Sequence, residues 1–235
     1  MKEQFLRQAM VFGPNSIDIL ADKHVIVFGI GGVGSFCAEG LARAGVGALT
    51  LVDNDVVGLT NLNRQLIALH STIGQNKTDV MAQRVLDINP DCRVTSLPML
   101  YNEDTKGSFF PGDYDYIIDC IDLVSCKLSL IQEARQLGIP IISAMGTGNK
   151  LDPSQFRITK ISNTAGCHLA RIMRKELKNR GISDHMVLYS EELPITPLAL
   201  EAPPPGRRSI PASVAWVPSC AGLMLAGYVV QELLK

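Results

Sequence analysis

The feature that most constrains the fold is a strand, a glycine-rich turn and a helix that follow one another directly. Residues 24–30 read HVIVFGI, a β-branched apolar run typical of a buried parallel strand. The turn carries four glycines: Gly29, Gly31, Gly32 and Gly34. Glycines let the backbone approach a phosphate closely, and the N–H groups that open the helix at 35–44 attract an anion. The sequence therefore predicts a nucleotide-binding turn.

The remainder of the first half alternates short apolar strands with helices, which favours a parallel sheet covered on both faces. We expect strands over residues 48–53, 93–97, 116–122 and 140–144, and helices over residues 76–87 and 125–137. The predicted fold class is α/β, with a Rossmann-like, doubly wound, mostly parallel sheet. Residues 1–150 are predicted to form the nucleotide-binding domain.

The pattern changes after Gly148. We expect two more strands at 156–161 and 187–192, a basic helix at 168–180, a proline-rich loop at 194–211 and a C-terminal helix at 219–234. We interpret residues 151–235 as a C-terminal strand-and-helix extension packed on the same domain. The apolar stretch from Val214 to Val230 contains proline and small residues, so we expect a buried helix there and no membrane span.

Composition narrows the choice of function only a little. A formal net charge of -1 over 235 residues does not predict a nucleic-acid or membrane partner, so any basic surface must be local. The six cysteines include no C-x-x-C pair, which argues against a zinc site. Free cysteines and an N-terminus without a secretory pattern lead us to expect a cytoplasmic protein.

A segment downstream of the glycine turn distinguishes between nucleotides. Asp53 ends the second strand about 20 residues after the glycines, where a carboxylate can bind a ribose. A dehydrogenase that binds NAD shares these features, but it has no need of the amides and cations that follow. Arg64 and Lys77 could bind phosphate oxygens, and Asn61 and Gln65 could hydrogen-bond neighbouring groups. Each residue alone could equally be a surface or structural residue, and their joint occurrence favours ATP.

Two acids end the fourth predicted strand, at the edge where ligands of open α/β sheets bind. They are Asp119 and Asp122. A carboxylate there suits a Mg²⁺ ion that keeps most of its waters and bridges phosphates. Asp119 could instead be a structural acid that caps a turn.

Five separated strings occur in an order that resembles the ubiquitin-activating-like superfamily, which includes ThiF and MoeB. They are GIGGVG, LVDNDVV, TNLNRQ, GQNK and DCID. The resemblance covers roughly residues 4–150. It implies an adenylation domain that binds ATP through Gly31, Asp53, Asn61, Arg64 and Lys77, with Asp122 holding Mg²⁺. It also implies a homodimer in which Arg7 reaches the partner's ATP.

The second half is similar to the family of tRNA threonylcarbamoyladenosine dehydratases, in the segment SAMGTGNKLDPSQFRITKISNTAGCHLARIMRKELKNRGI at 143–182. The resemblance implies that ATP activates the carboxylate of a threonylcarbamoyl group on a tRNA adenosine. The carbonyl carbon of the adenylate is then attacked within the same group, AMP leaves, and a cyclic nucleoside results. Arg64, Lys77, Mg²⁺ and Arg7 from the partner are the expected charge neutralisers.

The predicted basic helix is the candidate RNA-binding surface. Arg171, Arg174, Lys175 and Lys178 recur at spacings of three and four, so they share a broad face that could contact phosphates. Alternatively, and with equal weight, these side chains form a solvated helix face that binds no RNA. Arg207 and Arg208, in the proline-rich loop, could add to it. The region 151–235 is accordingly the predicted site of tRNA or dimer contacts.

Three other functions stay open at this stage. A sulfur-carrier adenylyltransferase would activate a protein's C-terminal glycine, and a sulfur-relay partner would then be expected. Cys167 or Cys220 could accept an acyl or persulfide group, although structural roles are commoner for such residues. The remaining alternatives are a nicotinamide-dependent dehydrogenase and a catalytically silent module that senses nucleotide.

Overall fold

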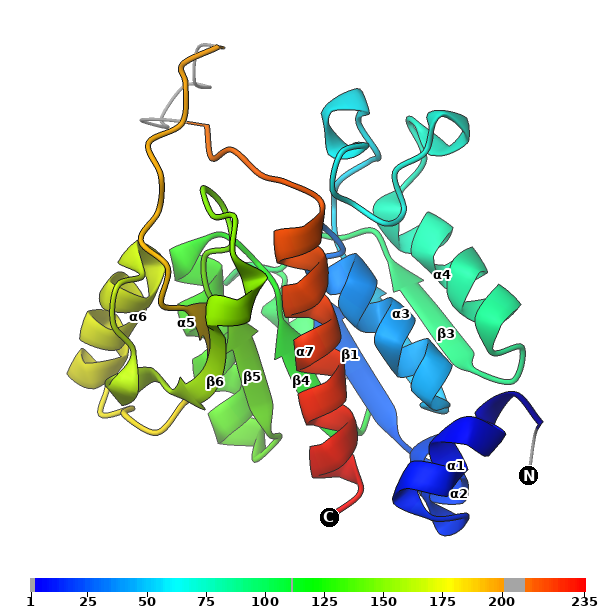
Figure 1. Ribbon diagram of the computed structural model, residues 1–235. Helices are drawn as coiled ribbons and strands as arrows, with labels where there is room; N and C mark the ends of the chain where they lie inside the picture. Colours follow the sequence, from blue (N-terminus) through cyan, green and yellow to red (C-terminus); the bar gives the residue numbers. More distant parts are fainter. Residues whose placement is uncertain (1–2, 111, 201–209) are drawn as a thin grey trace.

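The computed structural model describes residues 3–110, 112–200 and 210–235, and it is built around one seven-stranded sheet (Figure 1). The strand order is β3-β2-β1-β4-β5-β7-β6, and every pair is parallel except β6 with β7. The strands are β1 (His24–Phe28), β2 (Ala48–Val52), β3 (Arg93–Leu97), β4 (Tyr116–Asp119), β5 (Ile141–Ala144), β6 (Phe156–Lys160) and β7 (Met186–Ser190). The predicted fold class is confirmed.

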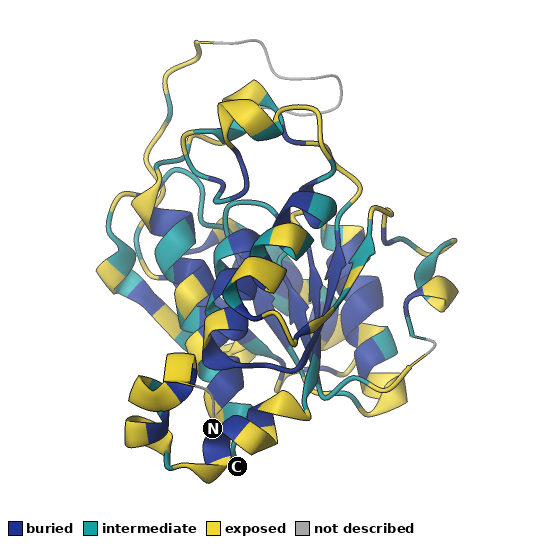
Figure 2. Ribbon diagram, turned by 90° about the vertical axis from the view of Figure 1, so that its right-hand side faces the viewer, coloured by how far each residue is buried: buried dark blue, intermediate teal, exposed yellow. Residues whose placement is uncertain are grey.

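Helices cover both faces of the sheet, which makes the apolar strands a buried middle layer (Figure 2). Helices α3, α4 and α7 pack on one face, and α5 and α6 on the other. The helices are α1 (Leu6–Phe12), α2 (Asn15–Ala21), α3 (Gly34–Ala44), α4 (Lys77–Ile88), α5 (Val124–Leu137), α6 (His168–Asn179) and α7 (Trp216–Leu233).

The chain after residue 150 joins the same sheet and the same core. Strand β7 pairs with β5, and α7 returns to pack along α3. The two helices approach closely because a Cβ on Gly222 would lie 2.2 Å from the carbonyl oxygen of Val33. The prediction of a buried C-terminal helix is thus confirmed. No helix among the described residues is long and apolar enough to span a bilayer.

Helix α7 begins at Trp216, three residues before the predicted start at residue 219. The observed helix takes Pro218 into its first turn. Proline is tolerated in a first turn, where its missing N–H has no intrahelical acceptor to lose. The earlier start seats the first turn of α7 beside the glycine turn, where Pro218 Cβ lies 3.2 Å from the position of a Cβ on Gly32.

The two N-terminal helices lie at the opposite end of the sheet from the glycine turn (Figure 1). The side chain of Gln8 on α1 donates to the carbonyl of Ala44, the last residue of α3. Gln4 donates likewise to Ile88, the last residue of α4. These contacts fix α1 at the amino-end edge of the parallel strands.

Candidate nucleotide site

The glycine turn lies where the strand order reverses, between β1 and β4. Gly29 has φ +88°, and a Cβ there would lie 2.8 Å from the carbonyl oxygen of Cys120 at the end of β4. A Cβ on Gly34 would lie 1.7 Å from the Gly29 oxygen. Only glycine fits both positions. In open α/β sheets ligands bind in the crevice at this reversal, so the turn is in the expected place for a nucleotide.

Asp53 connects the end of β2 to the glycine turn. Its Oδ2 accepts a hydrogen bond of 2.6 Å from the Ile30 N–H, and its Oδ1 accepts one of 2.9 Å from the Asp55 N–H. Burial raises the pKa of the Asp53 carboxyl, while the charge of Lys77 and these two hydrogen bonds oppose the rise. The predicted ribose acid is therefore also a brace for the turn.

Lys77 opens helix α4 and is buried, yet its ammonium group reaches the same region. Its Nζ lies 2.7 Å from Oδ2 of Asp55, whose side chain is 62% exposed, whereas that of Lys77 is 6% exposed. The Lys77 N–H also donates to the carbonyl of Asp55. The ammonium group of the buried Lys77 therefore ends beside the Asp55 carboxylate, which is open to solvent.

The segment around Arg64 packs against the outer side of the glycine turn. The Gln65 Nε2 lies 3.8 Å from the position that a Cβ on Gly31 would occupy. The Arg64 carbonyl oxygen lies 3.6 Å from the position of a Cβ on Gly32. The Arg64 Nη1 donates to Thr60 at 2.9 Å and to Asn63 Oδ1 at 3.0 Å.

Asn61 stabilises the same segment from within. Its Oδ1 accepts from the Gly58 N–H at 3.0 Å, which closes the short turn that precedes Arg64. Asn61 therefore holds the backbone of this segment in place.

Asp119 and Asp122 differ in their exposure to solvent. Asp119 is fully buried, and its Oδ2 lies 2.9 Å from the Nζ of the equally buried Lys127. Lys127 also donates to the Ile121 carbonyl at 2.9 Å, and the Ile121 N–H donates to Asp119 Oδ1 at 3.0 Å. Asp122 is exposed and directly follows this braced turn. Asp119 is hence a structural acid, which was one of the two roles that the sequence allowed.

Two residues of this region were missed by the sequence analysis. Asp55, in the string LVDNDVV, could have been noticed as the second acid after β2. Lys127 gave no signal, because a lysine in the first turn of a predicted helix is normally solvated. Its burial depends on the tertiary position of Asp119 beneath α5.

The residues beside the glycine turn leave an acceptor that fits a bound nucleotide. The side chain of Gln65 is buried beside the turn, and its Oε1 has no hydrogen-bond partner in the protein. Gly31 leaves space on the same side. An unpaired buried acceptor implies a partner from a ligand or water. The described residues contain no group of three or more His, Cys, Asp or Glu side chains that could hold a metal ion.

Arg7 is the one predicted catalytic residue that lies elsewhere. It is exposed on α1, at the amino-end edge of the sheet, whereas the glycine turn lies at the carboxyl-end edge (Figure 1). Within one protomer Arg7 therefore does not belong to the site. The predicted role of Arg7 in the partner's site stays a prediction.

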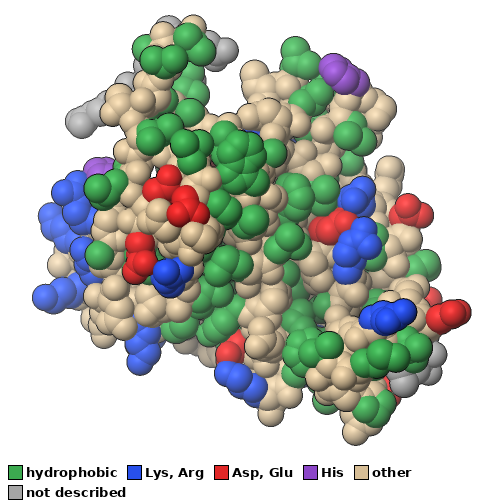
Figure 3. Space-filling model, viewed as in Figure 1, with side chains coloured by type: hydrophobic (Ala, Val, Ile, Leu, Met, Phe, Trp, Pro, Cys, Tyr) green, Lys and Arg blue, Asp and Glu red, His purple; other side chains and the backbone are tan. Residues whose placement is uncertain are grey.

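The candidate RNA-binding helix is α6, and its basic side chains gather at one edge of the molecule (Figure 3). Arg171, Lys175 and Lys178 are exposed. Arg174 is half-buried. Its Nη1 donates to the carbonyl oxygen of Thr164 at 2.5 Å and to the Oγ1 of Thr164 at 2.7 Å. Arg174 thus fastens α6 to the preceding loop. Arg207 and Arg208 lie outside the described residues.

The cysteines are all free thiols. Cys37 is in the core and Cys120 packs against it beside the glycine turn, where burial raises the pKa of the Cys120 thiol to about 12. Cys167 is buried at the start of α6, and Cys220 is half-buried in α7. His168, the neighbour of Cys167, faces Arg171 at 3.0 Å. These surroundings favour structural roles for Cys37 and Cys120.

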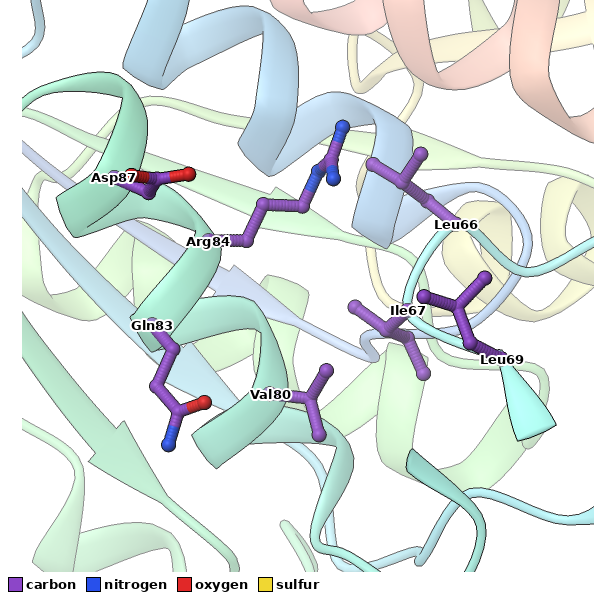
Figure 4. Close-up of a pocket in the computed structure, with 7 residues that line it drawn as sticks. All are labelled: Leu66, Ile67, Leu69, Val80, Gln83, Arg84 and Asp87. Carbon is purple, nitrogen blue, oxygen red and sulfur yellow. The ribbon is translucent and has the colours of Figure 1, made fainter. Parts of the chain in front are cut away.

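A hollow of about 350 Å³ lies between α4 and the segment that follows Arg64 (Figure 4). Its lining residues are Leu66, Ile67, Leu69, Val80, Gln83, Arg84 and Asp87. Arg84 is paired with Glu39 on α3 at 2.6 Å. None of the lining residues belongs to the glycine turn or to the ends of β1, β2 and β4. The hollow is therefore separate from the nucleotide site.

A Rossmann-like sheet with a glycine turn at the strand reversal, braced by a carboxylate at the end of the next strand, defines a nucleotide-binding protein. The ThiF family model matches residues 5–235, nearly the whole chain. The chain belongs to the ThiF family. This membership removes the nicotinamide-dependent dehydrogenase as an alternative.

Comparisons with individual proteins narrow the relationship. The chain is 44% identical over 244 residues to a tRNA threonylcarbamoyladenosine dehydratase of Bacillus subtilis, which covers 100% of this chain and 96% of the relative. It also resembles crystal structures of the Escherichia coli tRNA N6-threonylcarbamoyladenosine dehydratase, TcdA, in complexes with ATP and with AMP. Each has a TM-score of 0.89 and 33% identity, and covers 99% of this chain and 94% of the other.

Proposed function

We propose that this protein is an ATP-dependent tRNA threonylcarbamoyladenosine dehydratase. The observation that carries the proposal is the convergence of Lys77, Asp53 and the Arg64 segment on one glycine turn. The near full-length similarity to dehydratases, and to a structure that contains ATP, supports it. The full substrate is a tRNA whose adenosine carries a threonylcarbamoyl group.

The glycine turn and the cations have the task of holding a triphosphate. Backbone N–H groups of the turn and the start of α3 would bind phosphate oxygens, and the Asp53 carboxylate would accept from a ribose hydroxyl. Lys77 and Arg64 would neutralise charge that develops on the phosphates during transfer. Gln65 Oε1 would accept a hydrogen bond that the protein itself does not supply.

A magnesium ion would be held by Asp122, and it would neutralise phosphate charge and align the leaving group. The braced turn formed by Asp119, Ile121 and Lys127 sets the position of Asp122.

The reaction has two steps. A carboxylate oxygen of the threonylcarbamoyl group attacks the α-phosphorus of ATP, and the bond to pyrophosphate breaks. A nucleophilic atom of the same group then attacks the acyl carbon, loses its proton to solvent, and expels AMP. The net change is loss of one water from the nucleoside and conversion of ATP to AMP and pyrophosphate. The site contributes charge neutralisation and alignment.

The finer features of this function are proposals as well. The protein is proposed to act as a homodimer in which Arg7 of each protomer enters the partner's site. Helix α6 and the extension are proposed to contact tRNA, and a sulfur-relay protein is a possible further partner.

Turnover of defined RNA tests the function. The protein should convert a threonylcarbamoyladenosine-containing anticodon stem-loop to its dehydrated form only with ATP and Mg²⁺. Pyrophosphate exchange that required a protein with a Gly-Gly tail and ignored RNA would favour a sulfur-carrier adenylyltransferase. ATP binding without AMP release on either substrate would indicate a nucleotide-sensing module.

A further inference from the structure

The chain's one tryptophan, Trp216, is half-exposed at the first position of α7. Its indole is fixed, because Nε1 donates a hydrogen bond of 2.7 Å to the carbonyl of Leu151. Because the indole N–H is paired, the part of the ring that meets solvent is apolar. A large aromatic ring held in one orientation at the surface is suited to stacking.

Trp216 opens the helix whose first turn lies beside the glycine turn. Pro218, two residues on, packs against Gly32 of the glycine turn. Ser213, three residues before Trp216, accepts a hydrogen bond of 3.0 Å from Asn63 Nδ2, next to Arg64. The chain on either side of Trp216 is therefore held against the glycine turn and against the segment that carries Arg64.

A second set of hydrogen bonds holds the segment that contains Leu151. Asn149 adopts φ +60°, a conformation that asparagine tolerates better than most residues. It exchanges two hydrogen bonds with Ala212, at 2.8 Å through its N–H and 2.7 Å through its Oδ1, and its carbonyl accepts from the Ile195 N–H at 2.9 Å. Asn149 thus connects Ile195 and Ala212, which lie before and after residues 201–209, to the segment of Leu151, whose carbonyl accepts the Trp216 hydrogen bond.

We propose that Trp216 is a stacking platform for the adenine that carries the threonylcarbamoyl group. This inference rests on the function proposed above. The reacting carboxylate must reach the α-phosphate at the glycine turn, so the base that bears it must lie just outside. An aromatic side chain at that rim meets the face of an unstacked base, as is common in RNA recognition. Hydrophobic side chains gather around the upper end of α7, which limits hydration of the stacked base (Figure 3).

The single tryptophan makes the contact directly measurable, because all indole emission comes from Trp216. Saturation with an anticodon stem-loop should quench this emission, whereas the same RNA with an abasic site at the modified position should bind about tenfold more weakly and quench little. An emission that responds to protein concentration and not to RNA would place the indole between two copies of the chain and overturn the proposal. Equal quenching by both RNAs would also overturn it.

Substitutions give the second readout. Trp216→Ala should raise the KM for RNA about tenfold and leave the KM for ATP within about twofold, whereas Trp216→Phe should retain most of the affinity. In the Trp216→Ala protein the abasic site should cost no further affinity, because the stacking partner is already gone. Leu86→Ala, which shortens an exposed apolar side chain on α4, is the matched control and should change neither KM.

These outcomes are separable from failure of the proposed function. If the wild-type protein releases no AMP with the modified RNA, the dehydratase activity is refuted whatever the fluorescence shows. If it turns over and Trp216→Ala does so with an unchanged KM for RNA, only the stacking role is refuted.

Discussion

The Nζ of Lys77 lies 2.7 Å from Oδ2 of Asp55, and the lysine is buried while the aspartate is open to solvent. The pair has consequences for ATP binding, because phosphate oxygens and the Asp55 carboxylate compete for the same ammonium group. The first prediction concerns this competition. Asp55→Asn should bind ATP several-fold more tightly in equilibrium titrations, since the amide holds Lys77 less strongly. Weaker binding by Asp55→Asn would mean that the carboxylate assists the nucleotide.

Removal of either cation should abolish most of the chemistry and spare the fold. Lys77→Ala and Arg64→Ala are each expected to lower the AMP formation rate by about 100-fold or more, the magnitude typical for the loss of a group that stabilises transition-state charge. Circular dichroism and thermal unfolding serve as the control for folding. Wild-type rates in both variants would refute their assignment to the phosphates.

Arg7 provides a test of the homodimer. Arg7→Ala and Lys77→Ala should each be nearly inactive alone. In mixed dimers, one site combines the intact Lys77 of one protomer with the intact Arg7 of the other. Equimolar mixing with subunit exchange should therefore restore about a quarter of wild-type activity. Mixtures that stay inactive after exchange would show that Arg7 does not act across an interface.

Breaking the buried ion pair of Lys127 and Asp119 is expected to lower the free energy of unfolding. Lys127→Met leaves Asp119 buried without its cation, which should destabilise the protein by about 3–5 kcal/mol in urea unfolding. The double variant Lys127→Met with Asp119→Asn should regain much of that loss, because no uncompensated charge remains. A double variant no more stable than the single one would contradict this account of the pair.

His185 predicts a pH dependence of stability. It is buried, with Nε2 2.8 Å from Ser143 Oγ, and burial, aided by the charges of Lys127 and Arg135, lowers its pKa to about 3. The unfolded chain therefore binds a proton below pH 6.5 that the folded protein does not, so this contribution to stability is present above that pH and is lost towards pH 3. Between pH 6.5 and 5 the wild-type protein should lose about 2 kcal/mol more than His185→Asn. Parallel losses would contradict the buried neutral imidazole.

The sequence predicted the nucleotide turn and its acid because their signals are local. Gly29, Gly34 and Asp53 act within a strand, a turn and the end of the next strand, and the periodicity of the sequence already locates those elements. Lys127 and Trp216 could not be predicted in this way. The burial of Lys127 arises from β4 beneath α5, and the orientation of Trp216 from a hydrogen bond to residue 151, 65 positions away.

Arg174 illustrates a further limit of periodicity. The spacing of three and four correctly grouped it with Arg171, Lys175 and Lys178 on α6, but spacing cannot show that Arg174 turns back onto Thr164. The structure therefore leaves the other three as the more accessible candidates for RNA phosphates. The assignment of this helix to tRNA remains a prediction from the sequence.

The central claim is that this protein uses ATP to remove water from a threonylcarbamoyl group on tRNA. Nucleoside analysis of RNA incubated with the protein, ATP and Mg²⁺ tests it most directly. The account predicts that the modified adenosine disappears in favour of a cyclic, dehydrated nucleoside, with one AMP released for each. Unchanged RNA nucleosides under conditions where the protein binds both ATP and RNA would contradict it.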